Sequence, residues 1–148
     1  MSFGSIVVAV DGAMASQDAL DHAVYLARLG PVYLAGIFVV DAKWADFIGN
    51  DWQSAKGARQ GFLDYIRKEQ EEQAELARLQ FSLATQGMDR VVFSVHAGDP
   101  AEVLVAQSGS TDVLIASRRV FQVSGRPSLK SLASMLAKKA SCPLMLFP

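Results

Sequence analysis

Four cationic side chains gather in one short segment that follows an apolar strand pattern. They are Arg118, Arg119, Arg126 and Lys130. Guanidinium and ammonium groups that come together at a strand end could bind a phosphate or a carboxylate through their side chains. The alternative is a solvated basic loop that holds no ligand, and the sequence leaves both interpretations open.

An aspartate follows the first apolar run of the chain. Residues 6–10 read Ile-Val-Val-Ala-Val, and Asp11 and Gly12 come directly after them. An uninterrupted apolar run of this length is typical of a strand buried on both faces, and Asp-Gly favours a tight turn. Open α/β sheets bind ligands at the carboxyl ends of their strands, so Asp11 is predicted to face the functional site.

Two other polar residues at expected strand ends give weaker signals. Asp41 follows the second apolar run as Asp11 follows the first, but no third metal ligand is apparent, and the sequence predicts no metal site. His96 ends the third run and could act as a general base. No nucleophile or carboxylate partner is visible by spacing, which favours a strand-end histidine without a catalytic role.

The elements that would position these residues alternate along the chain. Strands are expected at 6–10, 32–40, 91–95, 112–116 and 143–147, and helices at 15–29, 62–86, 101–107 and 128–140. Their expected N-caps include Ser16, Asp99 and Ser128. The alternation predicts an α/β fold in which a single open parallel sheet carries helices on both faces, with one domain over residues 1–148.

Composition limits the classes of partner. The chain of 148 residues is 51% hydrophobic and has a formal net charge of −1, so no overall basic field attracts nucleic acid or an anionic membrane. The single cysteine, Cys142, excludes an internal disulfide framework, and no apolar run is long enough to span a bilayer. We therefore expect a cytoplasmic protein with neither nucleic acid nor a membrane as its partner.

Four segments carry a recognisable order and spacing. They are the run at 6–12 with Ser16 beyond it, His-Ala-Gly-Asp-Pro at 96–100, Asp-Val-Leu-Ile-Ala-Ser-Arg at 112–118, and Ala-Ser-Cys-Pro-Leu-Met-Leu at 140–146. Together they resemble the universal stress protein family from end to end of the chain. The resemblance implies a five-stranded sheet in the order 3-2-1-4-5, similar to that of adenine nucleotide alpha hydrolases, and a homodimer.

The resemblance also raises ATP as a ligand. ATP-binding members resemble one another in a loop after the fourth strand: Gly, two residues, Gly, nine residues, Gly, then Ser or Thr. Glycines there let backbone N–H groups approach phosphate closely. The matching positions here are Ala116, Arg119 and Lys130, with ten residues between the last two, and only Ser131 keeps its hydroxyl. These departures predict a degenerate loop, no tight ATP binding and no cofactor.

Three hypotheses for function follow. The first is a dimeric stress-response protein that acts through protein partners without ATP. The second is a sensor of a nucleotide or another anionic metabolite, whose candidate contacts are Asp11, Val40, Ala116, Arg118, Arg119, Lys130 and Ser131. The third is a phosphohydrolase, but the sequence lacks a metal-ligand cluster and a nucleophile–base pair, so no enzyme is expected.

The last apolar segment is the candidate dimer interface. In the implied order it lies at a sheet edge, where backbone groups lack partners, and two copies pairing antiparallel about a twofold axis would satisfy both edges. The expected interface residues are Leu144, Met145, Leu146 and Phe147. The alternative is a monomer whose edge is shielded by the loop that contains Trp44 and Trp52, and the role of that loop stays open.

Overall fold

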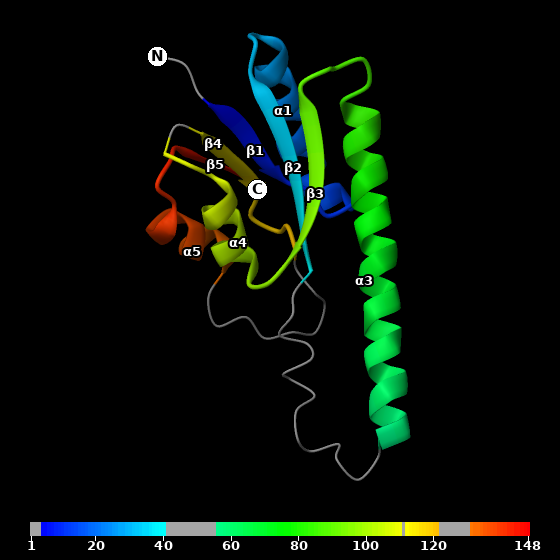
Figure 1. Ribbon diagram of the computed structural model, residues 1–148. Coiled ribbons are helices and arrows are strands. Elements are labelled where there is room, and N and C mark those ends of the chain that lie inside the picture. The colour runs from blue at the N-terminus through cyan, green and yellow to red at the C-terminus, as the bar shows by residue number, and fades with distance from the viewer. Residues whose placement is uncertain (1–3, 41–55, 111, 122–130) are drawn as a thin grey trace.

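The apolar runs of the sequence form the strands of one parallel sheet. The structure is a computed structural model that describes residues 4–40, 56–110, 112–121 and 131–148. Its strands are β1 (Ser5–Ala9), β2 (Tyr33–Val40), β3 (Val91–Ala97), β4 (Val113–Ser117) and β5 (Leu144–Phe147). They lie in the order β3-β2-β1-β4-β5 with every neighbouring pair parallel, which confirms the expected fold class and strand order (Figure 1).

Helices cover both faces of this sheet because strand side chains alternate between the faces. Ile6 and Val8 of β1 point to the face that carries the helices α1 (Gln17–Arg28) and α3 (Lys56–Ala84). Val7 and Ala9 point to the opposite face, and the described helices there are α4 (Pro100–Gln107) and α5 (Leu132–Lys139). All four β1 side chains are buried, as the uninterrupted apolar run predicts.

The boundaries of two helices differ from the expectation. The helix expected at 62–86 begins at Lys56 and ends at Ala84, and Figure 1 shows it extending past the carboxyl ends of the strands. The last helix begins at Leu132, and its N-cap is Ser131, whose Oγ accepts a hydrogen bond of 3.1 Å from the N–H of Ser134. Ser128, the expected cap, lies outside the described residues.

The other two expected caps have different outcomes. Asp99 caps α4 as predicted, because its Oδ2 accepts a hydrogen bond of 3.2 Å from the N–H of Glu102. The prediction for Ser16 is wrong: a 3₁₀ turn, η1 (Met14–Ser16), precedes α1, and the Ser16 hydroxyl makes no bond to the helix N-terminus. That hydroxyl turns instead toward the end of β1.

No helix in the described part of the chain is long and apolar enough to cross a membrane.

Two glycines let α3 approach the rest of the molecule closely. A Cβ atom on Gly12 would lie 2.7 Å from the backbone nitrogen of Ala77 and 2.8 Å from Cβ of Leu76. Gly12 also has a φ of +78°, which L side chains disfavour. A Cβ atom on Gly36 would lie 2.6 Å from the ring of Phe81, so the bare backbone of β2 is the surface on which that ring rests.

We predict that Gly12→Ala destabilises the protein far more than Gly87→Ala. Gly87 has nearly the same φ, +80°, but nothing lies within 4 Å of a Cβ placed there. Gly87→Ala, the control, should therefore lower the free energy of unfolding by only the cost of the left-handed backbone, about 1 kcal/mol. Gly12→Ala adds overpacking against α3 and should lower it by about 3 kcal/mol in all. Urea unfolding followed by circular dichroism measures both, and equal losses would contradict the close docking of α3.

Candidate functional site

The turning point of the sheet lies at β1. The strand order runs away from β1 in both directions, toward β2 and β3 on one side and toward β4 and β5 on the other. In open α/β sheets a ligand binds where the order reverses, in the crevice at the carboxyl ends of the strands. Here that crevice is bordered by the segments that follow β1 and β4, which contain the candidate residues Asp11, Arg118 and Arg119.

Asp11 lies inside this crevice and not on its surface. The residue is only 7% exposed, and its Oδ1 accepts hydrogen bonds from the Ser16 hydroxyl at 2.8 Å and from the N–H of Ala13 at 2.9 Å. Oδ2 accepts a longer bond, 3.4 Å, from the N–H of Phe121. The carboxylate thus joins the turn after β1 to the turn after β4 and already has protein donors on both oxygens.

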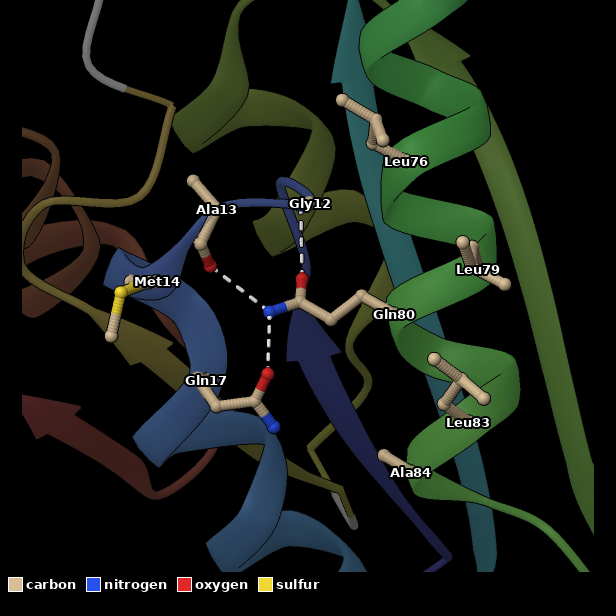
Figure 2. A pocket seen from close by; sticks show the side chains of 9 residues that line it. All are labelled: Gly12, Ala13, Met14, Gln17, Leu76, Leu79, Gln80, Leu83 and Ala84. Atoms are coloured by element: carbon tan, nitrogen blue, oxygen red, sulfur yellow. Dashed lines mark hydrogen bonds between the residues drawn. The ribbon is translucent and has the colours of Figure 1, made fainter.

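Two glutamines of α3 bind the backbone of the same turn. Oε1 of Gln80 accepts a hydrogen bond of 2.9 Å from the N–H of Gly12, and its Nε2 donates to the carbonyl oxygen of Ala13 at 3.0 Å (Figure 2). Nε2 of Gln73 donates to the carbonyl oxygen of Asp11. Residues seven apart lie on the same side of a helix, so both amides face the turn. Sequence patterning missed them, because it counts glutamine as solvent-facing.

A groove of about 440 Å³ lies beside these contacts, between η1 and α3. Figure 2 shows its lining residues, which are Gly12, Ala13, Met14, Gln17, Leu76, Leu79, Gln80, Leu83 and Ala84. Met14 is 90% exposed, and the three leucines are each at least half exposed. The amide of Gln80 is already bonded to the turn and to Oε1 of Gln17. The described lining has no charged side chain, so the groove suits an apolar contact and not a phosphate.

The predicted cations lie outside this groove. Arg118 and Arg119 follow β4 and are both exposed, and their backbone N–H groups are bonded to the carbonyl oxygen of Phe147 at 2.7 Å and to Oγ of Ser117 at 3.2 Å. Their side chains therefore extend from a turn that is fixed at its backbone. Arg126 and Lys130 lie outside the described residues, so the expected cluster of four is described only in part.

The remaining candidate contacts are spread over the elements that meet at this end of the sheet. Ala116 is fully buried within β4, where it packs toward α4 and α5. Val40 is the half-buried last residue of β2, and its carbonyl oxygen accepts a bond of 2.9 Å from the N–H of Gly98. Ser131 is exposed and is occupied as the N-cap of α5.

Two further features were not found from the sequence. Phe121 has a left-handed φ of 62°, and its ring packs against both core layers at the crevice. Oγ of Ser94 lies 2.9 Å from Nε2 of His96, because residues two apart share one face of β3. A serine–histidine contact becomes a catalytic pair only with an orienting group and an oxyanion site. In the described ranges, no three His, Cys, Asp or Glu side chains are placed to hold a metal ion.

The comparisons with known proteins agree with this architecture. The sequence profile of the universal stress protein family matches residues 2–148. A search of curated protein sequences finds no match. Among solved structures, the universal stress protein UspA from Lactobacillus plantarum is similar with a TM-score of 0.68 and 20% identity, over 100% of this chain and 99% of that chain.

Two other similar structures are complexes with nucleotides. A universal stress protein in complex with cAMP has a TM-score of 0.58 and 18% identity, over 100% of this chain and 98% of that one. The universal stress protein from Archaeoglobus fulgidus in complex with dAMP has a TM-score of 0.52 and 18% identity, with full coverage of both chains. Because the family profile spans nearly the whole sequence, this chain belongs to the universal stress protein family.

Proposed function

We propose that this chain is a homodimeric stress-response protein that acts through protein partners and does not use ATP. The observation that carries the proposal is that described groups at the strand ends are already bonded to the chain itself. The Asp11 carboxylate is bonded to Ser16, Ala13 and Phe121, and Ala116 is buried in β4. A triphosphate cradled by backbone N–H groups needs glycines where Ala116 and Arg119 stand.

The surface beside the crevice supports contact with another protein. Met14, Leu76, Leu79 and Leu83 expose apolar side chains around one groove. Contiguous exposed apolar surface is characteristic of protein interaction sites. We place the protein in the cytoplasm, where a chain with the single cysteine Cys142 needs no disulfide. No enzymatic activity is part of this proposal.

The open edge of β5 supports the homodimer. The carbonyl oxygens of Pro143 and Phe147 accept hydrogen bonds from the N–H groups of Leu114 and Arg118. The backbone of Pro143 and Phe147 therefore points toward β4. Since successive residues of a strand face opposite ways, the backbone groups of Leu144 and Leu146 point to the open edge. A second β5 running antiparallel about a twofold axis would pair with them.

We predict that Leu146→Pro weakens the dimer and that Leu146→Ala does so much less. Both variants lose a side chain that packs toward α4 and α5, but only proline also removes the N–H group at the open edge. Because the interface is twofold symmetric, each dimer loses this backbone hydrogen bond twice. The dissociation constant of the dimer should therefore rise by roughly 10- to 100-fold relative to the alanine variant. Analytical ultracentrifugation measures this, with circular dichroism as the folding control. Equal dissociation constants for the two variants, or a monomeric wild type at tens of micromolar, would refute the β5 dimer.

We predict that the wild-type protein has no low-micromolar affinity for ATP in the presence of Mg²⁺. The physical reason is that the side chains of Ala116 and Arg119 replace the glycines whose N–H groups would approach the phosphates. Isothermal titration calorimetry of the gently purified protein tests this, after mass spectrometry has checked for a co-purified nucleotide. A low-micromolar dissociation constant would overturn the proposal.

The second candidate function is a sensor of a nucleotide or another anionic metabolite. It is favoured by the two adjacent exposed guanidinium groups of Arg118 and Arg119 after β4, and by the cAMP and dAMP complexes among the similar structures. Guanidinium groups bind phosphate through paired hydrogen bonds that need no glycine loop. In this second function the ligand binds at the same end of the sheet, but side chains and not backbone N–H groups hold its phosphate.

If AMP binds to the wild type, we predict that replacing Arg118, Arg119 and Lys130 with alanine abolishes that binding. Each lost charge-assisted contact removes about 1.5–3 kcal/mol, so the three together should weaken the affinity by more than 100-fold. The matched control is Lys138→Ala with Lys139→Ala, which removes exposed cations from the last turn of α5. Unchanged affinity in the triple variant would place the ligand elsewhere.

A further inference from the structure

Phe121 adopts a backbone conformation that its residue type disfavours. Its φ of 62° lies in the left-handed region, and it is the one described non-glycine residue with a positive φ. For an L-residue this conformation costs about 1–2 kcal/mol and persists only when the surroundings impose it. Strain of this kind is concentrated at ligand sites and switch segments, so the contacts that hold Phe121 are informative.

Contacts on both the backbone and the ring hold Phe121 in place. Its N–H donates to Oδ2 of Asp11 at 3.4 Å, and its ring meets that of Phe38 edge-on, with centroids 5.8 Å apart and planes at 74°. The preceding residue, Val120, is buried and donates from its N–H to the carbonyl oxygen of Ser117 at 3.2 Å. A tight turn after β4 thus delivers one aromatic ring to the end of the sheet.

The ring lies where an open α/β sheet would accept a ligand. Phe121 packs against the side chains of both core layers, and its N–H bonds to Asp11, two residues after the end of β1. β1 and β4 are the neighbouring strands at which the sheet order reverses. This crevice is the general ligand position of such sheets. An edge-on aromatic contact with Phe38 is also one that another planar ring could make.

We propose that Phe121 is an internal plug that occupies the place of a ligand's planar ring and keeps the crevice closed. Moving the turn out of its left-handed conformation withdraws the ring, relieves the strain and frees Oδ2 of Asp11. The crevice then accepts a nucleobase-like ring, while the neighbouring exposed guanidinium groups of Arg118 and Arg119 can bind an attached phosphate. This inference rests on the proposed function, because the plug is a second obstacle to ATP beside the missing glycines.

The test compares Phe121→Gly with Phe121→Leu, using AMP as the probe. Glycine removes the ring and accepts the left-handed φ, whereas leucine keeps an apolar side chain in the crevice. We expect Phe121→Gly to bind AMP at least tenfold more tightly than the wild type by calorimetry, and Phe121→Leu to bind like the wild type. Adding Arg118→Ala to the glycine variant should reverse the gain. A glycine variant that binds AMP no more tightly than the wild type would overturn the plug.

A second measurement tests the strain without a ligand. Phe121→Gly and Phe121→Ala both remove the ring, but only alanine keeps the left-handed strain. The glycine variant should therefore be the more stable one, with an equilibrium constant for unfolding roughly tenfold smaller in urea titrations. If neither variant folds, the proposal is also overturned, because a plug is dispensable for the fold and a core residue is not. Low-micromolar ATP binding by the wild type would contradict both the proposed function and the closed crevice, whereas an unchanged AMP affinity of Phe121→Gly beside a wild type that binds no ATP would overturn the plug alone.

Discussion

The hydrogen bonds of the buried Asp11 carboxylate are the interaction on which this end of the molecule depends. The carboxylate of a residue that is 7% exposed must have donors, because an uncompensated buried charge is costly. Ser16 and Ala13 supply them from the following turn, and Phe121 supplies one from a segment 110 residues away in sequence. One side chain thereby fixes how the segments after β1 and β4 meet.

The same turn also determines where α3 lies. Gln73 and Gln80 bond to its backbone, and the missing side chain of Gly12 lets the helix approach to contact distance. On the sheet itself, Gly36 gives Phe81 a flat surface on which to rest. The long helix is therefore attached by the buried side chains of Ala77 and Phe81 and by these polar contacts, while a row of its leucines stays exposed beside the groove.

These contacts bear on function because they use groups that a nucleotide would otherwise meet. A backbone phosphate cradle depends on open N–H groups, but here the N–H groups of Ala13 and Phe121 are bonded to Asp11, and that of Arg119 is bonded to Ser117. The surfaces that stay available are of other kinds: an apolar groove, two guanidinium groups and the outer edge of β5. We propose that these surfaces serve to recognise another molecule.

The sequence by itself determined the order and type of the elements, since strand burial, tight turns and the Asp99 cap depend on neighbouring residues. The apolar run at 6–10, the Asp-Gly turn and the Asp99 cap are local signals, and the structure contains all three. Only the tertiary structure decided what Ser16, Gln80 and Phe121 do, because their partners are distant or are themselves placed by the fold. A serine before a helix is expected to cap it by accepting a bond from a helix N–H, but Oγ of Ser16 accepts instead from the N–H of Asp11 and donates its proton to the Asp11 carboxylate. The strained turn at Phe121 has no sequence signal, since a positive φ at phenylalanine follows from packing and not from residue preference.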